Sequence, residues 1–223
     1  MPESISEPNP SPFRPRDALH MTLAVRFIRH GESVANAGGV TAEPAGIALT
    51  ALGREQALAI ARGLAAAPDL IITSPYIRAR DSAAPTAARF PDVPVEVWPV
   101  QEFASLAFAR CENTTAMQRR PWVEDHWALA DPDRIDGPGA ECYAGLVGRV
   151  RAALKRLSEL SACSVAVFSH GQFMKAVQWE IVAGSPPVTP ETMRAFRAFH
   201  AAAPIANAEG FIARWNGERW RID

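Results

Sequence analysis

Two histidines stand directly after short apolar runs, at positions where a side chain could do chemistry. Residues 23–28 and 164–168 are rich in β-branched residues and predict buried strands, and His30 and His170 follow the ends of these strands. Each histidine is followed by glycine, which lets another group approach the backbone closely. Imidazole can act as a nucleophile or transfer protons near neutral pH. The two histidines are therefore the first candidates for a reactive site, and Arg29 precedes one of them.

A third strand end is followed by an arginine. Ser74 and Pro75 come after the apolar run 70–72, and Arg78 lies in the helical pattern that follows. The carboxyl ends of parallel strands meet at one edge of a sheet, so we expect the three segments to converge there. Forked guanidinium groups bind anions, and so do the amide N–H groups of a helix that begins at Gly171. The spacing therefore predicts a site for an anionic group.

The elements that position these residues alternate between strand and helix, with a further strand at 93–97. Helical spacing of apolar residues predicts helices after Thr50 and over 76–90, 141–160, 172–182 and 191–199. Pro85 is expected to end or kink the second of these helices. Asn216-Gly217 between two strand-like segments predicts a C-terminal β-hairpin. We expect an α/β fold, with a mostly parallel mixed sheet and helices on both faces.

Two segments fall outside this alternation. Residues 1–20 contain five prolines and lack the apolar centre of a signal peptide, so we expect a proline-rich tail. Residues from about 101 to 140 have no clean periodicity and predict a lid-like insertion over the site, with a helix inside it. We therefore expect one domain over residues 21–223.

The composition excludes several classes of protein. Among 223 residues, 23 basic and 24 acidic side chains give a formal net charge of −1, which argues against a nucleic-acid or membrane-surface binder. Three scattered cysteines, Cys111, Cys142 and Cys163, are too few for a disulfide framework or a zinc site. No apolar stretch is long enough to span a bilayer. We expect a cytoplasmic protein.

Four ordered motifs between Leu23 and Ala176 together resemble the histidine phosphatase superfamily, the phosphoglycerate-mutase-like proteins. In the third motif a serine replaces the threonine of the family pattern. The motifs are Arg29-His30-Gly31-Glu32-Ser33 with Asn36, Leu49-Thr50-Ala51-Leu52-Gly53-Arg54-Glu55-Gln56-Ala57, Ser74-Pro75-Tyr76-Ile77-Arg78-Ala79-Arg80-Asp81-Ser82-Ala83, and Ser169-His170-Gly171.

This resemblance implies a phosphoryl-transfer reaction that needs no metal and no cofactor. His30 would be the nucleophile and form a phosphohistidine, while Arg29, Arg78 and His170 would surround the phosphoryl oxygens. The imidazole must be neutral to attack, and neighbouring arginine cations lower its pKa. Asn36 corresponds to a phosphate contact of the family, although an asparagine after a strand is also a common turn former.

The resemblance also implies a general acid on the loop after the third strand, where Glu102 stands. Glu32 and Glu141 are the competing carboxylates. The mutases of the family carry Glu-Arg-x-Tyr-Gly at the acid, whereas here Glu102 is followed by Phe103-Ala104-Ser105-Leu106. This departure weakens the expectation of mutase activity and favours hydrolysis of a small phosphorylated metabolite. A mutase, a non-catalytic phospholigand-binding protein and a phosphatase acting on protein stay open as alternatives.

The insertion is expected to determine the substrate. Arg119 and Arg120 could bind a second anionic group, and the aromatic side chains Phe108, Trp122 and Trp127 could shape a pocket, with Arg110 nearby. The alternative is a solvated helix over a small separate core. His126 is expected at the surface. Homo-oligomers are common among the similar proteins, but nothing in the sequence specifies an interface.

Overall fold

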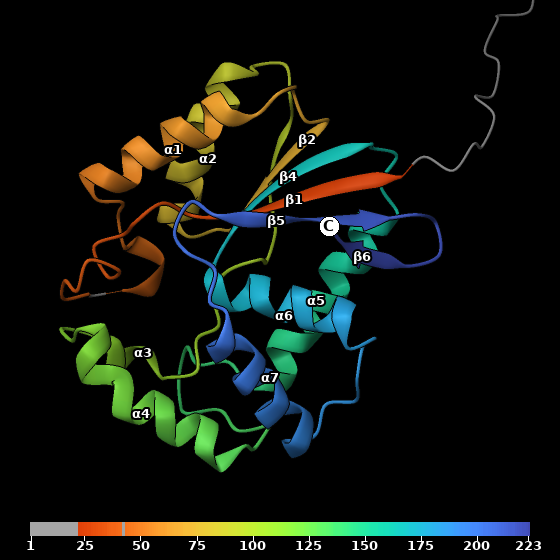
Figure 1. The fold of residues 1–223 in the computed structure, drawn as a ribbon. Helices are drawn as coiled ribbons and strands as arrows, with labels where there is room; N and C mark the ends of the chain where they lie inside the picture. The colour runs from red at the N-terminus through yellow and green to blue at the C-terminus, as the bar shows by residue number, and fades with distance from the viewer. Residues whose placement is uncertain (1–21, 42) are drawn as a thin grey trace, which may run out of the picture.

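The computed structural model describes residues 22–41 and 43–223, so the predicted tail lies outside the described residues. A six-stranded sheet in the order β3-β2-β4-β1-β5-β6 forms its centre (Figure 1). The strands are β1 (Leu23–Arg29), β2 (Leu70–Thr73), β3 (Val95–Val97), β4 (Ser164–Ser169), β5 (Gly210–Trp215) and β6 (Trp220–Ile222). The first four run parallel, and β5 and β6 form an antiparallel hairpin at one edge. The predicted mixed sheet and its C-terminal hairpin are confirmed.

Helices cover both faces of the sheet, as the alternation of strand and helix predicts (Figure 1). On one face lie α1 (Ala51–Gly63) and α2 (Ile77–Arg89); on the other lie α5 (Tyr143–Ser158), α6 (Gly171–Val182) and α7 (Pro190–Ala202). Alternate strand residues point to the two faces: Val25 and Phe27 belong to the large core beneath α5 and α6, and Ile28 belongs to the small core beneath α2.

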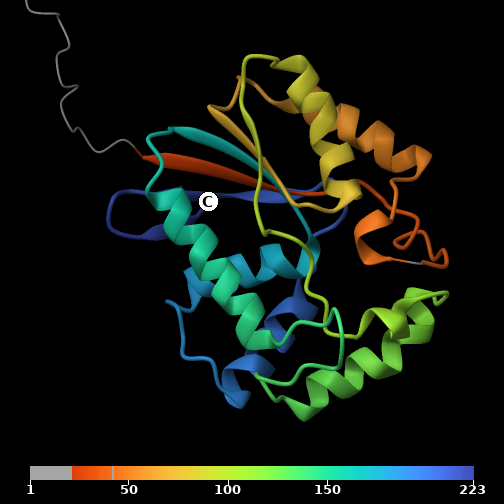
Figure 2. The same ribbon diagram turned by 180° about the vertical axis from the view of Figure 1, so that it is seen from behind.

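The segment between β3 and α5 contains α3 (Phe108–Cys111) and α4 (Ala116–Leu129). Figure 2 shows it leaving the sheet, turning through these helices and returning to the start of α5. Thr115 caps α4 by accepting a hydrogen bond from the Gln118 backbone N–H, and the Gln118 side chain returns one. Because α4 packs against α7, the segment is joined to the helical layer below the sheet.

The structure corrects two local predictions. Of the two outcomes expected at Pro85, an end or a kink, the helix end is wrong, because α2 continues through Pro85 to Arg89. Proline has no N–H, so the backbone carbonyl of Asp81, one turn earlier, lacks its usual helical donor. Asp81 is exposed, so water can donate this hydrogen bond instead. His126 is 3% exposed rather than a surface residue, because its ring packs beside Phe103 and Trp127 at centroid distances of 5.7 and 5.5 Å. Within residues 22–41 and 43–223, no helix combines the length and the apolar character that crossing a membrane requires.

Candidate active site

His30 lies immediately after β1, at the carboxyl edge of the sheet, and is 3% exposed. Its Nδ1 is 2.7 Å from the Gly31 carbonyl oxygen, which can only accept, so Nδ1 carries the proton in the neutral ring. Nε2 then holds a lone pair, which accepts a hydrogen bond from Arg78 Nε across 3.1 Å. Burial, followed by the positive charge of Arg78, lowers the pKa of His30 to about 3. The imidazole is therefore neutral at neutral pH, as a nucleophile requires.

His170 lies behind His30 and is fully buried. The two imidazole centroids are 4.9 Å apart, and His170 Nε2 is 2.7 Å from Ser74 Oγ. Ser74 also accepts a hydrogen bond from the Tyr76 backbone N–H, which fixes its hydroxyl at the end of β2. Burial, and then the charge of Arg78, holds the pKa of His170 well below its ordinary value. Two neutral imidazoles thus stand side by side at the edge of the sheet.

The guanidinium groups of Arg29 and Arg78 are each fixed by one backbone carbonyl. Arg78 Nη1 donates to the Pro44 carbonyl and Arg29 Nη1 donates to the Ile205 carbonyl, both across 2.6 Å. The Nη2 groups make no hydrogen bond to the described residues, and Arg29 Nε is buried without a partner. The two side chains therefore present unused N–H donors, held in place before any anion arrives.

The carboxylate of Glu102 is held at the start of α6. Its Oε1 accepts hydrogen bonds from the backbone N–H groups of Phe103, Gln172 and Phe173 at 3.1, 3.0 and 3.4 Å. The last two donors belong to the first turn of α6, the helix start where the sequence predicts an anion. In this structure, the carboxylate of Glu102 occupies that helix end. Oε2 forms no hydrogen bond to the described residues.

Asn36 is both a turn former and a cavity residue. Its Oδ1 accepts hydrogen bonds from the Ser33 backbone N–H and hydroxyl, at 3.2 and 2.8 Å, and from Asn207 Nδ2 at 3.1 Å. Asn207 also donates to the His30 carbonyl across 3.0 Å, so it braces the loop that carries His30. The sequence analysis missed Asn207, which follows no strand and belongs to no motif.

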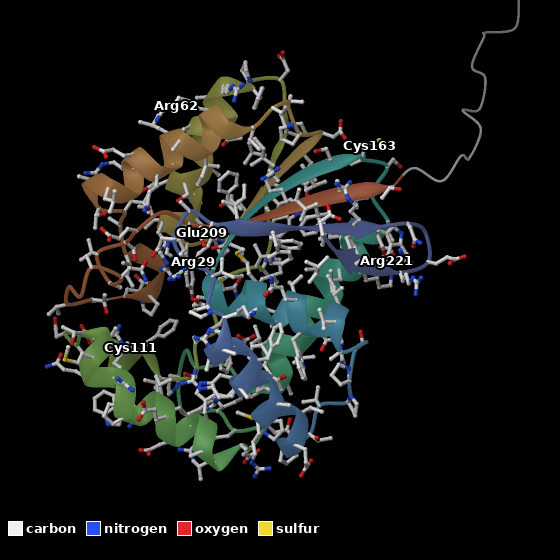
Figure 3. All side chains as sticks on the ribbon, in the orientation of Figure 1. Arg29, Arg62, Cys111, Cys163, Glu209 and Arg221 are labelled. Atoms are coloured by element: carbon white, nitrogen blue, oxygen red, sulfur yellow. The ribbon has the colours of Figure 1, made fainter. Side chains whose placement is uncertain are left out.

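Most of these side chains line one cavity of about 310 Å³ between the sheet edge and the insertion, whereas His170 and Asn207 are not on its lining. Figure 3 shows two of its lining residues, Arg29 at the end of β1 and Cys111 on α3. Its polar wall also contains Tyr76 and Gln172, two residues that the sequence analysis did not single out. The site residues on its lining are Arg29, His30, Asn36, Arg78, Glu102 and Arg119, and its apolar lining includes Ile47, Phe103, Leu106 and Val123.

Arg119 and Arg120 are adjacent in α4, but the structure brings only the first to the cavity. Arg119 Nη1 donates to the Thr114 carbonyl and to Thr41 Oγ1 at 2.7 and 3.0 Å, which ties α4 to the loop after β1. Arg120 is exposed and pairs with Glu124 across 2.7 Å, away from the lining residues. Gly171 is not on the lining either; it lies against the Arg29 guanidinium, where an added Cβ would be 3.5 Å from Nε.

The other candidates of the sequence analysis have structural partners. Glu32 accepts a hydrogen bond from Thr50 Oγ1 across 2.7 Å, and Glu141 pairs with Arg149. Arg110 pairs with Asp136 across 2.7 Å and lies over the Trp122 ring. None of these residues lines the cavity, and neither do Phe108 and Trp127, so the expected aromatic pocket is not found. Over the described ranges, no three His, Cys, Asp or Glu side chains are grouped so that they could hold a metal ion.

The fold and the site define an α/β protein that gathers a neutral imidazole, two guanidinium groups and a carboxylate around one cavity at the carboxyl edge of its sheet, with a second neutral imidazole buried beside the first. A family model confirms this class. The chain belongs to the histidine phosphatase superfamily (branch 1), whose model matches residues 25–222. None of the curated proteins compared with the chain matches it significantly in sequence.

Solved structures of low sequence identity have the same fold. A putative α-ribazole-5′-P phosphatase from Escherichia coli is 22% identical, with a TM-score of 0.68, over 90% of this chain and 94% of that chain. A mycobacterial glucosyl-3-phosphoglycerate phosphatase is also 22% identical, with a TM-score of 0.68, over 91% and 97% of the two chains. A histidine-to-alanine variant of phosphoserine phosphatase from Entamoeba histolytica, in complex with phosphoserine, is 18% identical, with a TM-score of 0.65, over 90% and 94%.

Proposed function

We propose that this protein hydrolyses a small phosphomonoester through a phosphohistidine intermediate on His30. The observation that carries the proposal is the state of the imidazole: Nδ1 donates to the Gly31 carbonyl, and the Nε2 lone pair faces Arg78. Phosphoryl transfer needs mainly positioning and stabilisation of negative charge. The fixed guanidinium groups of Arg29 and Arg78 offer both, next to the nucleophilic nitrogen.

The first half-reaction transfers the phosphoryl group from the ester to the protein. The Nε2 lone pair forms the N–P bond while the P–O bond of the ester breaks. Arg78 releases Nε2 as the phosphate enters, and its N–H groups and those of Arg29 bind the phosphoryl oxygens. Glu102, protonated on the free Oε2, gives its proton to the departing alcohol oxygen. His170, neutral and fully buried, packs against the His30 ring and supports the nucleophile from behind the cavity lining.

The second half-reaction returns the protein to its starting state. Water attacks phosphorus, Glu102 takes up a proton of this water, and the N–P bond breaks to restore the Nε2 lone pair. Inorganic phosphate leaves. Phe103, on the apolar lining, stands where the mutase pattern Glu-Arg-x-Tyr-Gly has its arginine, so this position offers no cation to a second phosphate group. This departure favours hydrolysis over the return of the phosphoryl group to a substrate.

The size and lining of the cavity support a small metabolite as substrate. A volume of about 310 Å³ suits a small molecule rather than a folded protein surface. Beyond the phosphate site, the Nε and Nη2 groups of Arg119 make no hydrogen bond to the described residues and are available to a second polar or anionic group of the substrate. The phosphatases of the same fold are named for α-ribazole-5′-P, glucosyl-3-phosphoglycerate and phosphoserine, all of them phosphate esters of alcohols.

The test is release of phosphate from para-nitrophenyl phosphate in EDTA between mildly acidic and neutral pH, with the wild type compared with His30→Ala. We expect metal-independent turnover in the wild type and a loss of at least about 1000-fold in the variant. Circular dichroism of both proteins controls for folding. Equal release by the two proteins would show that His30 is not the nucleophile. Absence of release from both would favour the mutase or the phospholigand-binding alternative.

A further inference from the structure

Arg149 lies in α5, outside the cavity, and all of its nitrogens donate hydrogen bonds to residues around Glu102. Nε and Nη2 donate to the two carboxylate oxygens of Glu141, each across 2.6 Å. Nη1 donates to the carbonyls of Pro99 and Gln101 at 2.8 and 3.1 Å. The ion pair is mostly buried, with side-chain exposures of 16% for Arg149 and 22% for Glu141.

These partners lie at the two ends of the insertion. Pro99 and Gln101 are in the segment that enters it and leads directly into Glu102, whereas Glu141 is the residue at which the chain returns before α5. The Glu141 backbone N–H also donates to the Ala104 carbonyl across 2.7 Å, two residues beyond Glu102. Arg149 therefore joins both ends of the insertion next to Glu102 in the chain.

The Arg149 guanidinium also contacts Phe173, one of the residues that hold the Glu102 carboxylate. It lies 5.3 Å from the centroid of the Phe173 ring, and the Phe173 backbone N–H is one of the donors to Glu102 Oε1. The backbone before Glu102, the backbone after it and the helix end that holds its carboxylate thus all contact the Arg149–Glu141 pair. Glu102 itself makes no ion pair with Arg149.

We propose that the Arg149–Glu141 pair is a clasp that positions Glu102 for proton transfer, which makes Arg149 a positioning residue. This inference rests on the proposed function, in which Glu102 protonates the leaving alcohol. A proton transfer requires the donor oxygen within hydrogen-bond reach of the ester oxygen, and a displacement of about 1 Å can reduce a rate by about 100-fold. Loss of Arg149 frees the Pro99 and Gln101 carbonyls and leaves the Glu141 carboxylate without its partner.

The leaving group distinguishes this role from general structural support. An alkoxide is a poor leaving group and needs the proton of Glu102, whereas para-nitrophenolate leaves without it. Displacement of Glu102 should therefore slow hydrolysis of benzyl phosphate much more than hydrolysis of para-nitrophenyl phosphate. A loss of overall packing or of phosphate binding would slow both reactions by the same factor, because the two esters have similar shapes.

The experiment compares kcat/KM for these two esters in the wild type, Arg149→Met and a matched control, Arg151→Met. Arg151 lies two residues further along α5 and makes the same kind of contacts: Nε donates to Glu180 Oε2 across 2.8 Å, and Nη2 donates to the Pro186 carbonyl across 2.6 Å. Neither partner lines the cavity. The control thus removes a comparable pair from the same helix at a distance from Glu102.

We expect Arg149→Met to lower kcat/KM for benzyl phosphate by about 100-fold and for para-nitrophenyl phosphate by no more than about threefold. Arg151→Met should change both by the same factor. If Arg149→Met does not fold, as thermal unfolding will show, Glu141→Gln replaces it with an expected bias of about tenfold in the same direction. Equal losses on the two esters, or none on benzyl phosphate, would overturn the role of the clasp.

The wild type and His30→Ala are measured beside these variants. Hydrolysis that depends on His30 but shows no leaving-group bias on loss of Arg149 contradicts only the clasp. Hydrolysis that survives in His30→Ala, or a wild type inactive on both esters, contradicts the proposed function and the clasp with it.

Discussion

Arg78 Nε donates a hydrogen bond to His30 Nε2 across 3.1 Å, so the guanidinium holds the lone pair that would attack phosphorus. Nδ1 of the same ring is fixed on the Gly31 carbonyl, which leaves Nε2 as the reactive nitrogen. The contact keeps the imidazole neutral and aims it at the position where the arginine can bind an incoming phosphate. An incoming phosphoryl group must displace the Arg78 hydrogen bond from Nε2, and the same guanidinium can then donate to the phosphoryl oxygens.

Substitution of Arg78 should therefore change both the rate and its pH dependence. We predict that Arg78→Met lowers kcat/KM by about 100- to 1000-fold, because a charged donor to the phosphoryl oxygens is lost. The positive charge of Arg78 lowers the pKa of His30, so the acid limb of the pH profile should move to higher pH in this variant. Arg78→Lys keeps the charge but not the fork, and should lose rate with a smaller shift of that limb. An acid limb at the same pH in all three proteins would contradict this coupling.

The buried histidines should make the fold sensitive to acid. Burial lowers the pKa of His30 to about 3, first by desolvation and then through Arg78, whereas the unfolded chain titrates near 6.5. Between these values the unfolded state binds more protons than the folded state, so the free energy of unfolding falls as the pH is lowered from 6.5 toward 3. One such group contributes a slope of up to about 1.4 kcal/mol per pH unit.

Urea unfolding of the wild type and of His30→Gln at several pH values measures this slope. We predict a shallower pH dependence in His30→Gln, because one group that titrates only on unfolding has been removed. His170, whose pKa burial also holds well below its ordinary value, keeps part of the slope in the variant. An identical slope in the two proteins would mean that His30 is protonated to the same extent in the folded and unfolded states.

A close backbone contact explains why the motif that starts at Leu49 has a glycine at position 53. The first turn of α1 packs against the loop after His30 so closely that a Cβ on Gly53 would lie 2.0 Å from the Glu32 carbonyl oxygen. We predict that Gly53→Ala lowers the free energy of unfolding by about 2 kcal/mol and lowers activity, because the backbone next to His30 must shift. Gly63, at the other end of α1, has nothing within 4 Å of an added Cβ.

Gly63→Ala is therefore the matched control. Thermal unfolding should show this variant as stable as the wild type or more stable, by up to about 1 kcal/mol. Comparable destabilisation of both variants would show that the loss in Gly53→Ala comes from the helix and not from the contact with the loop.

Residues at strand ends could be predicted from the sequence because a strand boundary and a parallel sheet together fix where a side chain lies. His30, Arg29 and His170 were found in this way, and the helix predicted after Thr50 begins at Ala51. Asn207 could not be found, because its contact with His30 joins residues 177 positions apart through a loop without periodicity. A contact of this kind depends on how the whole chain folds.

The insertion was the least predictable part. Arg119 and Arg120 are adjacent, and successive residues of a helix point about 100° apart, so only the rotation of α4 decides which one reaches the cavity. The sequence of α4 has no apolar stripe from which this rotation could be predicted. Burial of His126 follows from the same packing against Phe103 and Trp127. The clasp at Arg149 was missed because its carbonyl partners carry no side-chain signal.

The most direct test of the mechanism is detection of the phosphorylated protein. The wild type and His30→Ala are mixed with para-nitrophenyl phosphate in EDTA and quenched within milliseconds in alkali, which preserves phosphohistidine. Peptide mass spectrometry then locates the phosphoryl group. We predict phosphorylation on His30 in the wild type and none in His30→Ala. Turnover without a phosphorylated histidine, or with the phosphoryl group on another residue, would contradict His30 as the nucleophile.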